Sequence, residues 1–485
     1  MKTQGTHRAL SSDRALAWIA GLAFLSLHAL WYGRVWPISS DGSHYLAIAR
    51  ELRLGHGPVD PIGFVGHPAP RAALHWPPLY PMAIAALNAS GLGWVAAARL
   101  VSLAGTLAAV VVFARLIASY ARGPARLVGV AWIATVPALA WHSELVASDG
   151  LSVGLVALTF LLLDRARGGL RAPEGFALGL VSGLAVATRW AVVALALPIA
   201  WRGLHELRAK RPGFVPWALA SMAGAASVLA PLVWWRLQVG DGPRAPTIET
   251  PASLAHDAVL AVVKVWGVNT LALGLLPALV ALSWEDDVVT DDEARDTSGV
   301  FWEHGVFVVT VIAIQLVAAL QYRIDTLGSR LLLPATPSMV LMAVLLAPRL
   351  RAASRWRPGP RLTAAAAAGA VFVALATHAV FVRRWATQRQ GRAAIEVVLP
   401  ALARLPAGAE VYTDAAELIT YRLDLRWTRR EHAPNGAFGP ISAARADCVA
   451  PARWWVTTPE TLGAPSMNEG DCAAAACLRA LPCAR

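Results

Sequence analysis

The apolar residues of this chain form long runs that short polar segments separate. A helix needs roughly 20 apolar residues to cross the hydrocarbon core of a bilayer, because it rises only about 1.5 Å per residue. Runs that approach this length recur from residue 15 to residue 382. We therefore predict a polytopic α-helical membrane protein with about eleven spans. They fall at 15–33, 95–117, 127–141, 150–163, 176–188, 190–204, 214–235, 268–284, 305–322, 331–347 and 362–382.

Basic residues predict how these spans are oriented. The first run follows Lys2, Arg8 and Arg14, and it ends in Trp31 and Tyr32 rather than at small residues, so we expect an uncleaved anchor. Its basic flank places the N-terminus, 1–14, in the cytoplasm. By alternation the arginine-rich loops then also lie inside, at 118–126, 164–175, 205–213 and 348–361. The protein is thus expected in the cytoplasmic membrane, with spans in 15–382.

Two polar segments are expected outside the cell membrane. The first outer loop, 34–92, is too rich in Pro, Gly and His to span. The tail, 383–485, reads as a small extracytoplasmic α/β domain, with strands near 409–414 and 454–458 and a helix at 391–404. All four cysteines lie there, at Cys448, Cys472, Cys477 and Cys483. Disulfides suit that compartment, although their pairing stays open; a metal site is the alternative, and the spacings match no zinc pattern.

Composition supports a lipid environment. Hydrophobic residues make up 56% of the chain and charged residues only 15%, with a mean hydropathy of +0.50. A soluble domain cannot bury that much apolar surface. The net charge of +12 is spread through short loops, so positive-inside bias explains it and nucleic-acid binding is not expected. One span carries Gly175, Gly179 and Gly183 at four-residue spacing, which predicts close helix packing.

Ionisable residues gather in the predicted outer loops and are nearly absent from the middle of the spans. The outer set comprises Asp41, His44, His75, His142, Glu144, Asp149, Arg189, Arg236, Arg323 and Arg330. An ion or proton pathway would need charges inside the spans. A site at the outer membrane–water boundary is therefore expected, and its substrate could be amphiphilic.

Four segments carry a resemblance to a known family. The first outer loop reads Ser40-Asp41-Gly42-Ser43-His44-Tyr45, then Ala49-Arg50-Glu51, and later His75-Trp76-Pro77-Pro78-Leu79-Tyr80-Pro81. The others are His142-Ser143-Glu144 through Asp149, Ala187-Thr188-Arg189, and Ser329-Arg330 through Pro337. In this order they resemble the GT-C superfamily of membrane glycosyltransferases, in the branch of protein mannosyltransferases and lipid A aminoarabinose transferases. The resemblance covers roughly 15–345 and the general form of the tail.

The resemblance implies an enzyme that moves a hexosyl or pentosyl group from a polyprenyl-phosphate sugar to a lipid, glycan or protein acceptor. It gives Asp41 the role of general base toward the acceptor hydroxyl. Arg330 and Arg189 are candidates to neutralise the donor phosphate, with Tyr45 and His75 nearby. Glu144 and Asp149 form a second acidic loop. A divalent metal is a candidate cofactor, with Asp41, Asp149 and His75 as candidate ligands. One base and a displaced phosphate imply inversion at the anomeric carbon.

Each of these residues also has a structural interpretation. Asp41 could cap the helix that begins near Gly42, and Asp149 could cap the span at 150. Glu144 could be a solvated loop acid, and the arginines could anchor the chain at headgroups. Loop histidines are more often solvated than metal-bound.

The sequence departs from the family at two places, where Gly42 replaces a second acid and Trp76 replaces a lysine. The first weakens a paired-carboxylate metal site in this loop, and the second removes a phosphate-binding cation that Arg71 or His75 could supply.

Two functions from other classes compete with the enzyme. A transporter or flippase of a lipid-linked glycan would be expected to show internal repeats and polar sites near the midplane, and neither is detected. A membrane scaffold would not require the arrangement from Asp41 to Tyr45.

Overall fold

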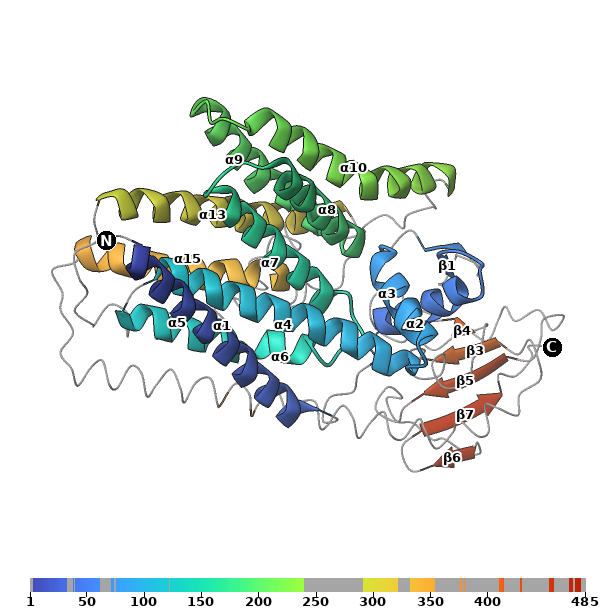
Figure 1. Cartoon of the computed structure of the whole chain (residues 1–485). Coiled ribbons are helices and arrows are strands. Elements are labelled where there is room, and N and C mark those ends of the chain that lie inside the picture. The colour runs from blue at the N-terminus through green and yellow to red at the C-terminus, as the bar shows by residue number, and fades with distance from the viewer. Residues whose placement is uncertain are drawn as a thin grey trace. The chain divides into compact units, whose positions relative to one another are not determined.

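Helices account for most of the residues that the structure describes (Figure 1). The structure is a computed structural model. It describes residues 3–32, 38, 40–61, 71–73, 76–121, 123–239, 291–321, 332–353, 376, 379, 410–413, 428–429, 453–457, 471–473 and 476–480. The chain divides into two units, and each is treated by itself. One comprises Met1–Tyr32, Ser102–Glu144 and Ser148–Val380; the other comprises Gly33–Val101, Leu145–Ala147 and Phe381–Arg485.

The first unit holds most of the predicted spans. Its elements are α1 (Thr3–Trp31), most of α4 (Trp94–Tyr120), α5 (Gly123–Thr135), α6 (Pro137–His142), α7 (Asp149–Ala166), α8 (Ala172–Thr188), the 3-10 helix η1 (Trp190–Leu195), α9 (Ala196–Arg208), α10 (Phe214–Val239), α13 (Asp291–Gln321), η3 (Leu333–Ala335) and α15 (Thr336–Ala353).

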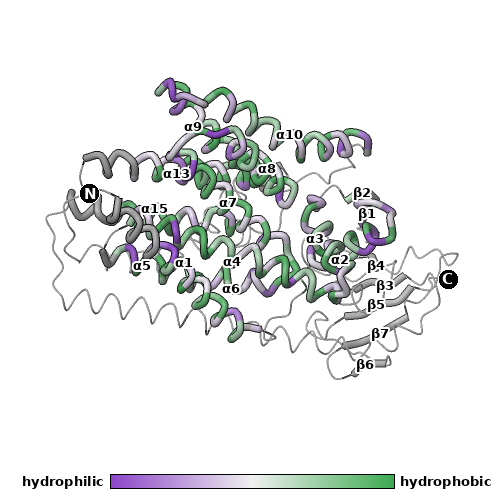
Figure 2. The backbone as a smooth tube through the Cα atoms, viewed as in Figure 1, coloured by the Kyte–Doolittle hydropathy of each residue, from purple (hydrophilic) through white to green (hydrophobic). Residues whose placement is uncertain are grey.

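Four of the described helices are long and apolar enough to cross a bilayer. The apolar segments are Asp13–Leu30, Trp94–Tyr120, Phe214–Gln238 and Thr297–Val317. Apolar residues dominate the trace of α4 (Figure 2). On α10 the side chains of Leu219, Met222, Trp234 and Leu237 are more than half exposed. Water would penalise such an apolar helix face, whereas lipid does not. The protein is a helical membrane protein, as its hydropathy predicts.

Several predicted spans are broken or displaced. The span at 127–141 is divided into α5 and α6, because Pro137 starts a new helix and Val136 before it is extended, with ψ 114°. The span at 190–204 becomes η1 and α9. Helix α13 begins at Asp291, well before the predicted 305, so the acidic segment just ahead of the predicted span is helical. The span at 268–284 and nearly all of 362–382 lie outside the described residues, and the count of eleven stays a prediction.

Small residues bring the helices of this unit close together. A Cβ on Gly105 would overlap the carbonyl oxygen of Gly150, so α4 and α7 approach backbone to backbone. Similarly, a Cβ on Gly175 or Gly179 would overlap carbonyl oxygens of α10. The predicted packing face of α8 is therefore confirmed, with α10 as its partner.

The second unit contains the predicted first outer loop, which is partly helical. Helix α2 (Ser40–Arg53) and helix α3 (Leu79–Ala89) pack together. Between them β1 (Val59–Asp60) pairs antiparallel with β2 (Arg71–Ala72), with Asp60 opposite Arg71. Gly55, with φ +80°, follows α2 in the left-handed conformation that commonly ends helices. In the described part of this loop, glycine therefore marks a turn between regular elements.

The tail of this unit forms a five-stranded sheet. Its strands are β3 (Glu410–Thr413), β4 (Thr428–Arg429), β5 (Arg453–Thr457), β6 (Asp471–Ala473) and β7 (Ala476–Ala480). Their order is β4-β3-β5-β7-β6, with β3 parallel to both neighbours and β7 antiparallel to both of its own. Strands β3 and β5 lie where strands are predicted. The helix predicted at 391–404 lies outside the described residues, so an α/β tail domain stays a prediction.

Candidate functional site

Asp41 lies in the first turn of α2 and is partly buried. The helix begins at Ser40, two residues ahead of the predicted start at Gly42. A carboxylate in the first turn meets the positive end of the helix dipole, which favours its ionised form. Asp41 therefore lies inside the first turn of the helix rather than at the capping position ahead of it. Its role as a base stays a prediction.

Two tyrosines fix α2 against α3. The ring of Tyr45 meets the ring of Tyr80 edge to face, with centroids 5.1 Å apart. The Tyr80 hydroxyl donates to the carbonyl oxygen of Ala98 at 3.1 Å. Both rings are buried. Tyr45 therefore packs inside this unit, and the donor contact that the family resemblance gives it stays a prediction.

A buried pair of His44 and Asp60, which the sequence does not predict, lies next to Asp41 in the chain: His44 follows it by one helical turn. His44 Nδ1 lies 3.0 Å from Oδ1 and 3.1 Å from Oδ2 of Asp60. The ring of Trp76 stacks on the imidazole at 4.0 Å between centroids and 13° between planes. Asp60 is 0% exposed and His44 is 4% exposed. Trp76, at the position where the family's lysine is missing, thus packs against a histidine.

The second acidic loop is buried in the first unit. Glu144 is 0% exposed, so its interpretation as a solvated acid is wrong. His28, from the end of α1, places Nδ1 3.0 Å from Glu144 Oε1 and 2.8 Å from Ser143 Oγ. The Ser143 hydroxyl donates to the carbonyl oxygen of Ala140 at 2.6 Å. Because the Ser143 hydroxyl donates its one hydrogen to Ala140, its oxygen accepts from His28, and Nδ1 of His28 carries the hydrogen.

Asp149 and Arg189 form an ion pair. Asp149 begins α7 and is fully buried, while Arg189 is the extended residue between α8 and η1. Their side chains are in direct contact. Arg236 of α10 lies over the neighbouring ring of Trp190, 5.1 Å from its centroid. The family resemblance assigns Arg189 to the donor phosphate; in this structure one of its terminal nitrogens, Nη1, already pairs with the carboxylate of Asp149.

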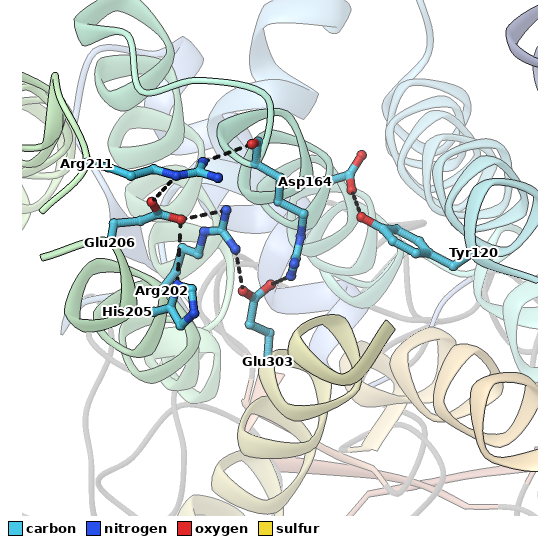
Figure 3. Close-up of polar contacts among 8 residues, drawn as sticks. Tyr120, Asp164, Arg202, His205, Glu206, Arg211 and Glu303 are labelled. Carbon is cyan, nitrogen blue, oxygen red and sulfur yellow. Dashed lines mark hydrogen bonds and ion pairs between the residues drawn. The ribbon is translucent and has the colours of Figure 1, made fainter. Parts of the chain in front are cut away.

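Further charges, which the sequence places in predicted loops or at span ends, pair with one another around α9 and α13 (Figure 3). Glu303 accepts from Arg167 at 2.7 Å and lies 3.5 Å from Arg202. Arg202 also pairs with Glu206 at 2.7 Å, and Arg211 reaches Glu206 at 3.2 Å. Two acids thus balance three arginines among the described residues of this cluster. Because each charge has an opposite charge nearby, the cost of burying it is offset.

Two predicted site residues, His75 and Arg330, lie outside the described residues. Within the described ranges, the structure brings together no group of three or more His, Cys, Asp or Glu residues that could hold a metal. Asp41 and Asp149 belong to different units. The metal prediction therefore keeps Asp41, Asp149 and His75 as candidates without a described centre.

Comparison with known proteins gives a likeness in structure alone. No family model matches the sequence, and no curated protein matches it. The crystal structure of ArnT from Cupriavidus metallidurans in the apo state superposes with a TM-score of 0.58 at 13% identity, covering 97% of this chain and 98% of that one. The structure of the same protein bound to undecaprenyl phosphate gives 0.52 at 12% identity, covering 99% and 98%. At the level of the fold the predicted resemblance is confirmed: this chain shares the fold of ArnT.

Proposed function

We propose that this protein is a membrane glycosyltransferase that moves a sugar from a polyprenyl phosphate to an acceptor outside the cytoplasm. The observation that carries the proposal is a fold shared with ArnT over 97% of the chain. One of those ArnT structures holds undecaprenyl phosphate. Fold alone does not determine chemistry, so the proposed activity also depends on the site residues. The order of motifs from Asp41 to Arg330 supplies that second support.

The residues suit such a reaction. The acceptor is a hydroxyl or similar group on a lipid, glycan or protein, and it attacks well only when a base removes its proton. Asp41, ionised in the first turn of α2, takes that role. The leaving phosphate gains charge as the glycosidic bond breaks, so it needs a cation; Arg330 and Arg189 are the proposed cations. A single displacement on the face opposite the phosphate inverts the anomeric carbon.

The experiment is product analysis with purified protein in liposomes. Radiolabelled polyprenyl-phosphate hexoses and pentoses are offered with a membrane glycolipid extract as acceptor, and the labelled product is separated from the donor. Transfer from one donor, with release of polyprenyl phosphate, is the expected result. The anomeric configuration of the product, read by NMR, tests inversion.

A control separates transfer from transport. The same liposomes, loaded with donor and no acceptor, are assayed for movement of the lipid-linked sugar between leaflets. If the lipid-linked sugar moves between leaflets and no donor gives a transfer product, the protein is a flippase and not a glycosyltransferase. Loss of transfer in the Arg330→Ala variant, with partial recovery in Arg330→Lys, is expected if this side chain holds the phosphate as a bidentate fork.

A further inference from the structure

The two faces of α9 are the reverse of those of a helix in a soluble protein. Its buried face carries Arg202 and Glu206, which pair with each other, and Arg202 also contacts Glu303 of α13. Its exposed face carries four large apolar side chains, each between 43% and 53% exposed, namely Leu197, Trp201, Leu204 and Leu207. Residues three or four positions apart share one face of a helix, so these four form an apolar stripe, the α9 stripe. Such a stripe suits lipid and not water.

The same helix ends in exposed cations. Arg208 belongs to the last turn of α9, Lys210 and Arg211 follow it, and all three are exposed; together they form the cationic turn. The one acid of α9, Glu206, is buried and already paired, so no carboxylate on this helix offsets the exposed cations. An apolar face next to a basic turn is typical of a helix at the boundary between acyl chains and headgroups.

Lys210 occupies a backbone position that favours glycine. Its φ is 49°, and within the described ranges it is the one residue other than glycine with a positive φ. The N–H of Lys210 donates to the carbonyl oxygen of Leu207 and the N–H of Arg211 to that of Glu206, the two bonds of a Schellman motif. The equivalent residue after α2 is Gly55. Lysine therefore carries a conformational cost here that glycine would not, which points to a role for its charge.

Neighbouring segments hold the cationic turn in place. The Arg211 side chain lies 3.2 Å from Glu206 and donates to the carbonyl oxygen of Arg167 at 3.0 Å (Figure 3). Just beyond it, a Cβ on Gly213 would lie 2.5 Å from the carbonyl oxygen of Leu170, so the two loops meet backbone to backbone. An anion that binds the cationic turn therefore meets a backbone that is already ordered, which lowers the entropic cost of binding.

We propose that the cationic turn and the α9 stripe bind an anionic phospholipid of the surrounding membrane. The phosphate lies among the side chains of the cationic turn, and the acyl chains lie along the stripe. This site is distinct from the proposed donor cation Arg189, which precedes η1 and so lies at the opposite end of the η1–α9 segment. The proposal does not depend on glycosyl transfer, and its test measures lipid binding.

Two simpler roles also explain cations at the end of a helix. A positive charge there interacts favourably with the helix dipole, and basic residues flank membrane helices on the cytoplasmic side. Neither role requires a lysine in the left-handed conformation, and neither gives the protein a preference for one lipid headgroup. Lys210→Gly separates these roles from lipid binding, because glycine removes the charge and adopts the same backbone conformation without strain.

The test is native mass spectrometry of the full-length protein in detergent, titrated with phosphatidylglycerol or with phosphatidylcholine of the same acyl chains. We expect wild type to bind one phosphatidylglycerol more tightly than phosphatidylcholine. Lys210→Gly should weaken phosphatidylglycerol binding about fivefold, and Arg208→Gln by a similar factor, the contribution of one basic residue beside anionic lipid. The matched control is Arg53→Gln in the last turn of α2, whose end has the same backbone motif; it should keep wild-type affinity.

Equal affinity of wild type for the two lipids overturns the proposal, and so does unchanged phosphatidylglycerol binding in Lys210→Gly. An equal loss in Arg53→Gln would show general charge attraction and also overturn it. Undecaprenyl phosphate should bind Lys210→Gly as it binds wild type; a parallel loss would make the cationic turn part of the donor site and end the case for a separate phospholipid site. If Lys210→Gly does not fold, the affinity of Arg208→Gln decides by the same criterion.

Discussion

At the scale of single residues, Asp41 is the position on which the proposed chemistry depends. Asp41→Asn keeps the size of the side chain but removes its ability to take a proton. We expect turnover to fall by roughly two orders of magnitude or more, the usual scale for loss of a general base. Binding of the polyprenyl-phosphate donor should persist, since α2 stays intact. Steady-state transfer and donor binding in detergent measure the two effects.

Two further variants serve as controls for this prediction. Asp41→Ala removes the first-turn charge and should lower the thermal unfolding midpoint slightly as well as the rate. Glu51→Gln, at the other end of α2, neutralises a carboxylate away from the proposed chemistry and should leave turnover unchanged. Near-normal transfer by Asp41→Asn would move the search for the base to Glu144 or Asp149.

Sequence reasoning found the acids but not their partners. Asp41, Glu144 and Asp149 stand out because they follow apolar runs, which local pattern shows directly. The contact of His44 with Asp60 depends on a hairpin that folds β1 back on α2, and the contact of His28 with Glu144 joins residues 115 or more positions apart. Neither pairing leaves a periodic signal. A histidine inside an apolar run, as at His28, was the available hint.

At the scale of elements, the α8–α10 contact gives a direct test of helix packing. Gly179→Ala adds a methyl group where the carbonyl oxygen of Ser221 already lies. The helices must separate, and overpacking of this kind costs about 1–3 kcal/mol. We expect a lower thermal unfolding midpoint for the purified protein in detergent, measured by differential scanning fluorimetry.

The control for this prediction is Gly203→Ala on α9. A Cβ there meets only Phe214, at an ordinary 3.8 Å, and alanine favours helix over glycine by about 1 kcal/mol. This variant should match or exceed wild-type stability. An unchanged midpoint in Gly179→Ala would show that α8 and α10 can move apart without loss.

Periodicity identified the helices better than it identified their ends. The apolar runs of α4, α8 and α10 coincide with the predicted spans, because burial and lipid contact both demand apolar side chains. The break at Pro137 was readable in principle, since proline cannot continue a helix from the preceding turn. The early start of α13 was not, because its first residues, Asp291 to Asp296, are mostly charged and read as a loop.

At the scale of the whole molecule, cysteine labelling can test the predicted orientation of the protein in the membrane. In a variant whose four native cysteines are replaced by serine, single cysteines are introduced at Gly168 and at Arg430. A membrane-impermeant maleimide applied to intact cells should label position 430 and not 168, because the arginine-rich loops stay inside. Labelling after permeabilisation confirms that position 168 is reactive. Reaction at 168 from outside would reverse the assigned sides of the membrane.

The buried cluster around Glu303 bears on how the protein is made. Arg167 leaves the ribosome 136 residues before Glu303, and Arg202 also precedes it by a long stretch of chain. Until α13 is inserted, these two arginines lack the carboxylate that balances them in the finished protein, and Glu206 alone must serve both Arg202 and Arg211. A nascent chain halted in this interval exposes uncompensated positive charge among its membrane helices. Insertion of α13 then brings Glu303 beside Arg167 and Arg202, so the charges of this cluster are balanced only after this late helix is in place.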